Sequence, residues 1–401
     1  MDIVFFAIAR WDAPYSSPSF CLATEFAKSH RVFYIDNPVT YKYFLSKFNT
    51  PEIRSRMKQL LLRKDIYKKL PATGGELIAV TPAMTMPINF LSKGSLLYES
   101  LSHVNDDIIS GTLTKLIRDY NIKDFLFINS FNPFYLRSFP SSFKPSTYAY
   151  LTIDDIAVSA HINKHGPRLE EEMVKKSDVT FTTSSELRRL NLPFNKEVYV
   201  VPNAADVSLF KTALTSDLPR PKEIADVTKP IVIYTGHLEH RTDFDLMRHV
   251  MKEHLDELFL FVGPVTLEPE LLEEMKAMPN TMFTGSKNIK ELPAYLKYSD
   301  VAIIPYKHNK LTRSIYPLKV NEYLAAGKPV VATTFSEDMK DFSEVVKVVP
   351  DAASFSKAIT ESLQENSPGK VEQRVKFVEN NNWGTRTNEI LRIVSTLKSR
   401  R

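Results

Sequence analysis

The hydrophobic and polar positions of this chain follow one pattern twice, in which short apolar runs alternate with segments of helical periodicity. In the first half, the apolar runs have the length and composition of buried strands. They cover residues 3–8, 32–35, 77–80, 125–129, 147–153, 179–182 and 198–201. Helical patterns lie between them, as at residues 19–30 and 106–120. Strands that alternate with helices predict a parallel sheet covered on both faces.

The pattern restarts after a loop at residues 203–230 that is rich in Pro, Asp and Thr. The second set of strand-like runs covers residues 231–234, 259–262, 281–283, 301–304, 330–332 and 345–349. We therefore expect an α/β protein with two Rossmann-like, doubly wound parallel-sheet domains, residues 1–202 and 203–377. A C-terminal helix at about 378–401 is expected to pack back on the first domain. Such domains bind ligands at the carboxyl ends of their strands, so a cleft between the two domains is the expected site.

Composition supports a globular chain and excludes several classes. Apolar residues make up 43% and charged residues 25% of the 401 residues, which is typical of a soluble protein. No apolar run approaches the roughly 18 residues of a membrane span, so we expect a cytoplasmic protein. The single cysteine, Cys21, excludes an internal disulfide and a cysteine-based zinc site. The eleven glycines follow neither the Gly-x-Gly-x-x-Gly nor the P-loop spacing, which disfavours dinucleotide dehydrogenases and P-loop NTPases.

The most informative segment covers residues 317–332. Pro317 suits the first position of a helix and Gly327 suits the position just past its end. Lys319 and Glu322 are three residues apart, so they share one face near the helix N-terminus. Such a face can hold a phosphate on its lysine and N–H groups and a sugar diol on its glutamate. The alternative is an ordinary amphipathic helix with a surface ion pair.

Other loops of the second half follow strand ends in the same way. Gly236 lets the backbone approach a ligand, and Arg241 precedes a helix N-terminus that favours a diphosphate. The loop at residues 284–289 offers backbone groups that can read a base edge. Besides Lys319 and Glu322, the residues we expect at this edge are Gly236, His237, Arg241, Gly285, Ser286 and Ser314.

In this order, these loops resemble those of retaining GT-B glycosyltransferases of family 4. Residues 200–206 precede them as Val-Val-Pro-Asn-Ala-Ala-Asp, and Asn382-Trp383 follows near the end. The most specific string is Pro-Leu-Lys, followed by Glu-Tyr-Leu-Ala-Ala-Gly-Lys-Pro-Val-Val, within residues 317–331. The chain is most similar to a bacterial branch that acts on cell-surface polysaccharides, including transferases resembling those of teichuronic acid synthesis. The resemblance implies a GT-B fold and a hexosyltransferase-type enzyme.

By position, the resemblance assigns Glu322 to the ribose hydroxyls of the donor nucleotide and Lys319 and Arg241 to its diphosphate. The family commonly has a second glutamate near the donor sugar, where this chain has Ser314. It also often has an arginine directly after the glycine of the first loop, where this chain has His237. The resemblance therefore favours a nucleotide-sugar donor, with UDP-sugars first, and leaves the sugar open.

The expected chemistry needs no metal and no other cofactor. Charge builds on the departing diphosphate during sugar transfer, and we expect Arg241 and Lys319 to stabilise it. The resemblance implies that the leaving phosphate helps to deprotonate the acceptor. If the protein supplies a base, the candidates are Asp154 and Asp155, which follow the strand at 147–153. The alternative for this pair is capping of the strand end.

Residues after the first strand are expected on the acceptor side. They are Arg10, Trp11 and Asp12. Trp11 is either a platform for stacking a sugar or a lid on the sheet edge. His161 and His165 follow the aspartate pair and either contact an acceptor or diphosphate or are ordinary loop histidines.

Two arrangements resemble metal sites but have simpler interpretations. The stretch Asp243-Phe244-Asp245 imitates an Asp-x-Asp motif, yet its position at a helix start favours capping. His237 and His240 near Asp243 lack a third histidine at ligand spacing. We therefore predict no metal site.

Positive charge is concentrated in residues 41–70, which hold nine basic and two acidic residues although the net charge is only +5. A helix is expected to start at residues 50–52 with an apolar stripe formed by Ile53, Met57, Leu60, Leu61 and Tyr67. Basic residues flank this stripe and aromatic residues precede it, which suits an anionic membrane surface with a lipid-linked acceptor. The alternative is a domain helix with a solvated basic face. Nucleic acid is disfavoured because no recognition motif accompanies the charge.

The sequence therefore predicts a retaining transferase that builds a bacterial surface glycan on a glycan or lipid-linked acceptor. We place it in the cytoplasm, peripheral on the inner face of the plasma membrane. Two alternatives stay open: a GT-B-like sugar-nucleotide epimerase or phosphorylase, and a non-catalytic nucleotide-sugar-binding assembly subunit, which Ser314 would permit.

Overall fold

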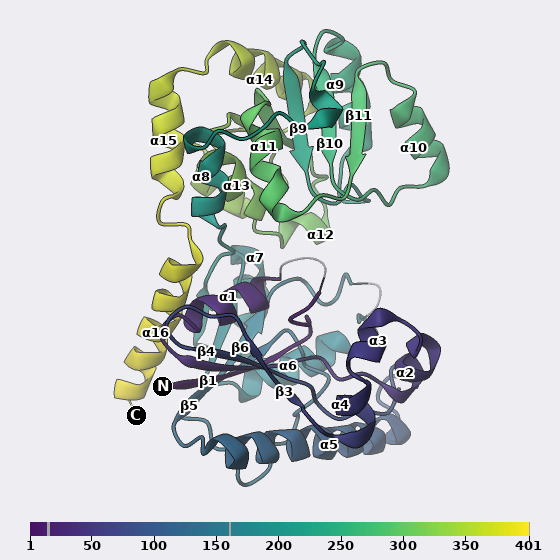
Figure 1. The fold of residues 1–401 in the computed structure, drawn as a ribbon, viewed down its shortest axis with the longest axis vertical. Coiled ribbons are helices and arrows are strands. Elements are labelled where there is room, and N and C mark those ends of the chain that lie inside the picture. Colours follow the sequence, from purple (N-terminus) through teal and green to yellow (C-terminus); the bar gives the residue numbers. More distant parts are fainter. Residues whose placement is uncertain (14–16, 160–161, 401) are drawn as a thin grey trace. The chain divides into compact units, whose positions relative to one another are not determined.

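Parallel strands dominate both sheets of the computed structural model, as the alternating pattern predicts. The structure describes residues 1–13, 17–159 and 162–400. The chain forms two compact units (Figure 1). The first contains Met1–Pro202 together with the C-terminal residues from Arg386, and the second contains Asn203–Thr385.

The sheet of the first unit has the order β3-β4-β2-β1-β5-β6-β7-β8. Its strands are β1 (Asp2–Ala7), β2 (Arg31–Ile35), β3 (Tyr67–Leu70), β4 (Glu76–Val80), β5 (Phe125–Ser130), β6 (Thr147–Thr152), β7 (Val179–Thr182) and β8 (Val198–Val200). Neighbours pair in parallel except β3, which runs antiparallel to β4 at the edge. The carboxyl ends of β1, β2 and β4 therefore lie at one edge of the sheet.

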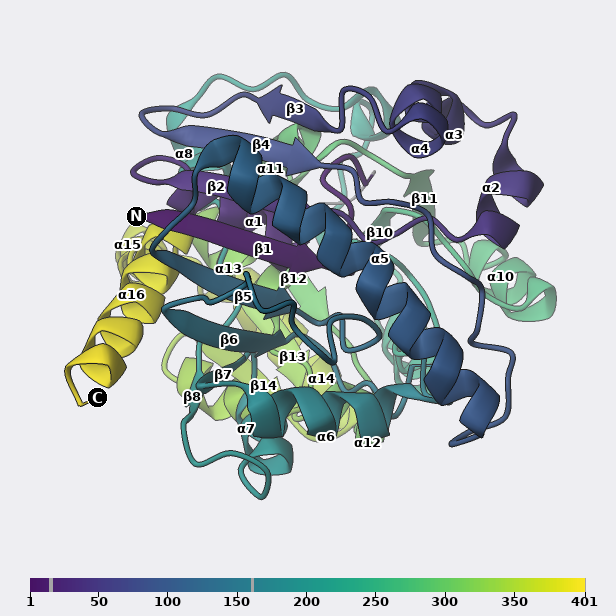
Figure 2. The same ribbon diagram turned by 90° about the horizontal axis from the view of Figure 1, so that it is seen from below.

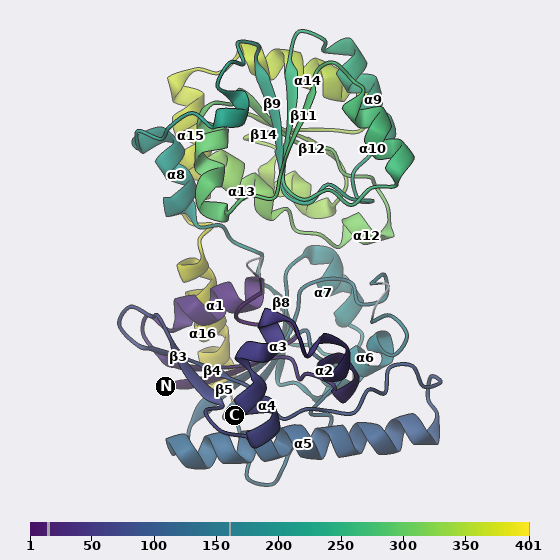
Figure 3. The ribbon, with the colours of Figure 1, turned by 45° about the vertical axis from the view of Figure 1, so that its right-hand side comes forward.

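Helices cover this sheet on both faces (Figures 2 and 3). They are α1 (Pro18–Phe26), α2 (Tyr41–Lys47), α3 (Pro51–Ser55), α4 (Met57–Leu62), α5 (Leu96–Tyr120), α6 (Gly166–Lys176), α7 (Ser185–Asn191) and α16 (Trp383–Ser399). The Ser95 hydroxyl caps α5 by accepting from the backbone of Tyr98. At the C-terminal end of α16, the Lys398 ammonium donates a hydrogen bond to Asp124 in the loop before β5, at 3.4 Å.

The sheet of the second unit is entirely parallel, with the order β11-β10-β9-β12-β13-β14. Its strands are β9 (Ile231–Thr235), β10 (Leu258–Val262), β11 (Thr281–Gly285), β12 (Val301–Ile304), β13 (Val330–Thr333) and β14 (Val346–Val349). Its helices are α8 (Val207–Thr215), α9 (Phe244–Glu253), α10 (Pro269–Lys276), α11 (Leu292–Lys297), α12 (Lys310–Arg313), α13 (Leu318–Ala325), α14 (Ala352–Gln364) and α15 (Pro368–Val378). The strand order reverses between β9 and β12, and a doubly wound sheet binds ligands at such a point.

The basic segment differs from the single amphipathic helix that the sequence predicts. Thr50 does cap a helix start, because its hydroxyl accepts from Ile53. The helix stops after one turn, however, and α3, α4 and β3 share the predicted apolar stripe. The break falls at Arg56, which is 5% exposed and turns its guanidinium into the unit. Leu61 points outward and is 53% exposed, so the predicted stripe does not form one apolar face.

No helix in the part of the chain that the structure describes has the length and apolar character needed to cross a membrane.

Candidate functional site

The turn after β9 contains a glycine, Gly236, so other groups can approach its backbone closely. Gly236 has φ 111°, a conformation that favours glycine, and a Cβ there would lie 2.5 Å from Cε of Lys319. Gly263, after β10, has φ 150°, and a Cβ there would lie 2.2 Å from the carbonyl oxygen of Gly236. Gly236 is therefore favoured by its backbone conformation and Gly263 also by the contact with backbone, and the Lys319 side chain lies against the backbone of the turn.

The Lys319 ammonium is bound by aromatic groups rather than by a carboxylate. Its Nζ donates to the Tyr306 hydroxyl at 3.1 Å. It also lies 5.6 Å from the ring centroid of Tyr234 and 5.8 Å from that of Tyr306. Within the described residues, Lys319 has no ion-pair partner, so its positive charge is available to an anion at the turn.

Arg241 places a second cation beside the same tyrosine. Its backbone carbonyl accepts a hydrogen bond from the backbone N–H of Lys307. The next residue, Thr242, forms an isolated antiparallel β-bridge with Tyr306. Its guanidinium pairs with Glu239, and Cζ lies 5.9 Å from the Tyr306 ring centroid. Nε of Arg241 is buried without an acceptor in the described structure. Arg241 therefore keeps a donor free near the turn.

Tyr306 lies between the two cations and is 3% exposed. Burial alone would raise the pKa of its phenol, but the charges of Lys319 and Arg241 lower that pKa below the usual value. The Tyr234 hydroxyl, 3.4 Å away, donates to the carbonyl of His237 at 2.9 Å. Neither tyrosine has a role among the predictions from sequence. Their position at the ends of β9 and β12 was the signal that could have found them.

The Glu322 carboxyl is buried on α13, one turn after Lys319. It is 7% exposed, and burial raises its pKa to about 7 against the opposing charge of Lys319. No hydrogen bond or ion pair engages this carboxyl among the residues that the structure describes. The alternative of an ordinary helix with a Lys319–Glu322 surface ion pair is therefore wrong. A buried acceptor without a partner suits a ligand with hydroxyl groups.

The remaining predicted donor residues lie at the same sheet edge but in different settings. Nε2 of His237 and the Thr266 hydroxyl are 2.7 Å apart. Gly285 and Ser286 are exposed at the end of β11, the outer strand of the sheet. Ser314 is 1% exposed and donates to the carbonyl of Leu311 at 2.8 Å, which places its hydroxyl on its own short helix.

The predicted capping of the helix after β9 is confirmed for Asp243, whereas Asp245 is exposed and pairs with Arg248. The Asp243 carboxylate accepts from the backbone of Leu246 at the start of α9. His237 and His240 flank Glu239 with Nδ1–Oε2 distances of 3.9 and 3.6 Å. Across residues 1–13, 17–159 and 162–400, no three His, Cys, Asp or Glu side chains are grouped so that they could hold a metal ion. Metal independence itself stays a prediction.

The aspartate pair of the first unit divides into two environments. Asp154 is exposed at the end of β6. Asp155 is buried, and its Oδ1 accepts from the backbone of Ala157 at 2.9 Å, as the capping alternative predicts. Behind them, burial raises the pKa of Glu170 to about 7, while its Oε1 accepts from Thr152 at 2.7 Å. The sequence analysis did not identify Glu170.

The two histidines that follow the pair have different outcomes. His165 is 1% exposed and stacks on Tyr98 with ring centroids 3.9 Å apart, so it is not a surface loop histidine. His161 lies outside the described residues.

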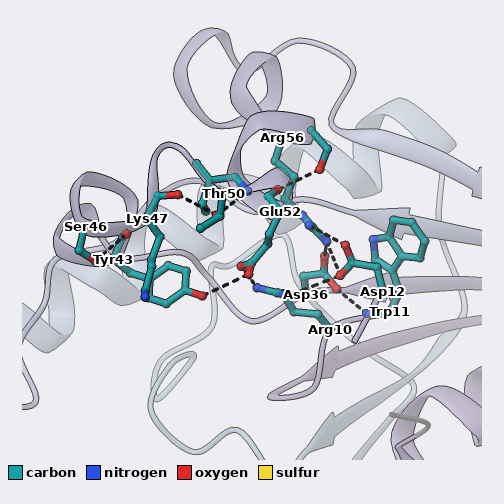
Figure 4. A network of polar contacts seen from close by, with 12 residues as sticks. Arg10, Trp11, Asp12, Asp36, Tyr43, Ser46, Lys47, Thr50, Glu52 and Arg56 are labelled. Atoms are coloured by element: carbon teal, nitrogen blue, oxygen red, sulfur yellow. Dashed lines mark hydrogen bonds and ion pairs between the residues drawn. The ribbon is translucent and has the colours of Figure 1, made fainter. Parts of the chain in front are cut away.

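The predicted acceptor-side residues form a polar network with the basic segment (Figure 4). The Arg56 guanidinium donates two 2.7 Å bonds to Asp12 and one 3.3 Å bond to Asp36. Asp36 also accepts from the backbone of Trp11, and burial raises its pKa to about 6 although Arg56 opposes the shift. Arg10 pairs with Asp12 and with Glu52.

Trp11 is not a free stacking platform in this structure. The Lys68 ammonium lies over its ring, 4.4 Å from the centroid. The Arg56 guanidinium also approaches the ring, with Cζ at 5.8 Å. The loop of residues 10–12 is therefore fixed by side chains from the segment 41–70.

Comparison with known proteins gives this geometry a context. Residues 229–365, which include the whole Gly236–Glu322 site, match the family model described as glycosyl transferases group 1. A Bacillus subtilis (strain 168) protein named putative teichuronic acid biosynthesis glycosyltransferase TuaH is 31% identical over 147 residues. That match covers 36% of this chain and 36% of the relative, so it spans about a third of either protein.

Solved structures match the fold of the whole chain. Sucrose-phosphate synthase from Thermosynechococcus elongatus matches with a TM-score of 0.66 and 15% identity over 100% of both chains. A structure described as trehalose-6-phosphate from E. coli bound with UDP-2-fluoro glucose matches with a TM-score of 0.70 and 11% identity over 99% of both chains. The predicted fold of two Rossmann-like domains, GT-B, is confirmed.

Proposed function

We propose that this protein is a glycosyltransferase that moves a sugar from a nucleotide-sugar donor to a glycan or lipid-linked acceptor. Two side chains on one face of α13 carry the proposal. The Lys319 ammonium has no ion-pair partner in the described structure, and the buried Glu322 carboxyl has no hydrogen bond there. Both lie in the domain that matches the glycosyl transferases group 1 model. A nucleoside diphosphate carries its anionic diphosphate next to a ribose diol, so a cation and a free acceptor one helix turn apart are complementary to it.

In this proposal, the donor diphosphate lies against the backbone of Gly236. Lys319 binds it with the ammonium hydrogens that Tyr306 leaves free, and Arg241 contributes its guanidinium. Charge that develops on the leaving diphosphate then meets fixed cations in a buried site, where electrostatic stabilisation is strong. Glu322 accepts hydrogen bonds from the ribose hydroxyls. Retention of configuration and catalysis without a metal rest on the family resemblance.

A UDP-sugar is the favoured donor, and a surface polysaccharide is the favoured product. The first choice draws on the E. coli structure, whose description includes UDP-2-fluoro glucose. The second draws on the teichuronic acid relative. The hexosyl class of the transferred sugar, the role of Asp154 or Asp155 as a base, and the contact of residues 41–70 with an anionic membrane belong to the same proposal.

The test begins with thermal-shift titrations of UDP-, GDP- and dTDP-sugars, followed by transfer and hydrolysis assays on each nucleotide that binds. We expect Lys319→Met to weaken binding of the nucleoside diphosphate at least tenfold, because the charge is lost while the stem is kept. Lys357→Met is the matched control, since Lys357 is 79% exposed elsewhere in the same unit. Equal affinities for the two variants would refute the assignment.

The same assays separate the alternative functions. Binding without hydrolysis or transfer would favour an assembly subunit, for which the buried Ser314 in place of a carboxylate is the supporting observation. Conversion of a UDP-sugar to its epimer would favour an epimerase.

A further inference from the structure

A cavity of about 290 Å³ lies in the first unit at the carboxyl ends of β1, β2 and β4. Its apolar lining includes Ile8, Ile88, Phe134 and Tyr135. Lys42 and Phe90 also line it and are exposed, so they mark its opening. Lys42 is the charged residue of this lining, and no carboxylate accompanies it among the described residues.

The polar side chains around this cavity are largely occupied by the protein itself. Asn105 bonds both the N–H and the carbonyl of Met86, at 2.7 and 3.1 Å. Asn37 accepts from Asn132, and the Tyr135 hydroxyl is 3.1 Å from that of Thr85. The Tyr98 hydroxyl differs, because it is buried without a partner in the described structure. The walls therefore offer a ligand mainly apolar contact rather than the many hydrogen bonds that a sugar needs.

Two segments that border the opening expose an unusual amount of apolar surface. We call residues 41–48 and 90–97 the rim. Its exposed apolar side chains are Tyr41, Tyr43, Leu45, Phe48, Phe90, Leu96 and Leu97, of which Leu96 is 87% exposed. Thr85 joins the segments, because its carbonyl accepts from Tyr41 and the residue itself precedes the second segment. In Figure 2, α2 and the start of α5 both lie on the right-hand side of the unit.

The charge of the rim is positive throughout. Lys42, Lys47 and Lys93 are exposed, and neither segment contains Asp or Glu. Apolar and tyrosine side chains next to lysines are complementary to the interface of an anionic bilayer. The surface lies on α2 and on residues 90–97, so it differs from the stripe at residues 53–67 that the sequence predicts.

We propose that the acceptor is a lipid phosphate. The rim enters the membrane interface, Lys42 binds the phosphate, and the cavity holds the part of the hydrocarbon chain next to the phosphate. This inference rests on the proposed transferase function and narrows its acceptor to the lipid-linked class. A free glycan would find few hydrogen bonds in these walls. Ile8 of the cavity lining and the loop of residues 10–12 both follow β1, so the cavity and the predicted acceptor-side residues share one strand end.

The cavity is tested with dodecyl phosphate below its micelle concentration, with methyl phosphate as the headgroup alone. We expect the intact protein to bind dodecyl phosphate at least tenfold more tightly than methyl phosphate. Phe134→Asp puts a carboxylate in the wall and Lys42→Glu repels the phosphate, so each should weaken dodecyl phosphate at least tenfold. Phe134→Leu is the matched control. Equal affinity for the two phosphates, or equal effects of Phe134→Asp and Phe134→Leu, would overturn the proposal.

The rim is tested by sedimentation with vesicles of phosphatidylcholine, with and without phosphatidylglycerol. The double variant Leu96→Ser/Leu97→Ser should lower binding to anionic vesicles at least fivefold, while Leu214→Ser, an exposed leucine of the second unit, should not. Unchanged binding of the double variant would overturn the proposal. A dimer in solution that the double variant disperses would do so as well, because the surface would then belong to a second copy.

Assays of donor binding distinguish failure of the lipid-phosphate acceptor from failure of the proposed transferase function. If UDP-sugars bind and transfer proceeds to water-soluble acceptors while dodecyl phosphate does not bind, this inference fails alone. If dodecyl phosphate binds and no nucleotide sugar does, the proposed transferase function fails.

Discussion

At the scale of single residues, Tyr306 connects the two cations of the proposed donor site. Its hydroxyl accepts from Lys319, and Arg241 approaches its ring, so one side chain sets the distance between the two cations. The pKa of its phenol is lowered by both charges, which reflects how strongly they act on this oxygen. We interpret Tyr306 as a positioning residue, because it would act on the proposed diphosphate through Lys319.

Tyr306→Phe removes the hydroxyl and keeps the ring. Loss of one hydrogen bond to a charged group costs about 1.5–3 kcal/mol. We therefore expect UDP and UDP-sugars to bind roughly ten- to a hundredfold more weakly, whereas uridine should bind as before because it lacks phosphate. Isothermal titration with these ligands checks the difference. Tyr295→Phe is the control, since its hydroxyl bonds Glu223 elsewhere in the unit. A parallel loss for uridine would indicate a general structural defect.

Glu322 makes the stability of the second unit depend on pH. Its pKa in the folded protein is about 7, above the usual value of 4.5, because burial disfavours the charged form. Between these values the folded state holds the proton more tightly, so stability should fall as pH rises from about 4.5 to 7. Glu322→Gln cannot ionise and should be more stable than the original protein at pH 8, by about 1–3 kcal/mol.

The measurement is urea unfolding at pH 5 and pH 8, monitored by a signal that does not depend on tryptophan, such as circular dichroism. The same variant should bind UDP more weakly, because an amide replaces the carboxylate at the ribose. Glu270→Gln, on an exposed position of the unit, is the matched control. A stability difference that does not change between the two pH values would contradict the interpretation.

At the scale of elements, the joint between α3 and α4 is fixed by one buried cation. Arg56 compensates two carboxylates, Asp12 and Asp36, and so ties the loop after β1 to the basic segment. Arg56→Met would leave these carboxylates without their partner. Removing one side of a buried ion pair costs about 3–5 kcal/mol. We expect the first unit to be destabilised by about this amount.

Thermal unfolding at pH 7.5 and pH 5 tests this joint. The pKa of Asp36 is about 6 with Arg56 present, so its protonation at pH 5 should recover part of the lost stability. Arg54→Met, on an exposed neighbour, should change little. If both arginine variants unfold alike, the buried ion pair does not stabilise the joint.

The elements that the sequence predicts well are those with a local signature. Buried strands such as residues 231–234 are short apolar runs, and α13 has its proline and glycine at the ends. The sequence misses β3 because its pattern Tyr-Lys-Lys-Leu is that of an edge strand, with two exposed lysines. It also misses the first ten residues of α5, where Leu96 and Leu97 face outward and break the helical periodicity.

The residues of the candidate site also differ in whether a local sequence pattern identifies them. Lys319 and Glu322 were found because both lie on one predicted helix, three residues apart. Tyr306, Glu239 and the Arg56 joint were not, because their roles depend on partners that are distant in sequence or that only packing selects. Arg56, for example, contacts Asp12 across 44 residues and Asp36 across 20. Single-sequence patterns contain no information on such pairings.

At the scale of the whole molecule, the chain passes between its two units twice, after Pro202 and within α16. From Arg386 onward, α16 belongs to the first unit, and it buries Ile390, Ile393 and Val394. Each of these side chains contributes roughly 1.5–3 kcal/mol of hydrophobic stabilisation. The first unit therefore depends on residues at the far end of the sequence, whereas the second unit, Asn203–Thr385, is continuous.

Ile390→Ala tests this division. Truncation of a buried isoleucine costs about 2–5 kcal/mol, and Ile390 is 1% exposed, so the first unit should unfold at a lower temperature. The second unit should keep its transition and its shift on addition of UDP. Differential scanning calorimetry with and without UDP resolves the two, and Arg392→Ala, on the exposed face of α16, is the control. An equal decrease of both transitions would mean that the units unfold as one cooperative body, and the C-terminal helix would then stabilise the donor site as much as the sheet it joins.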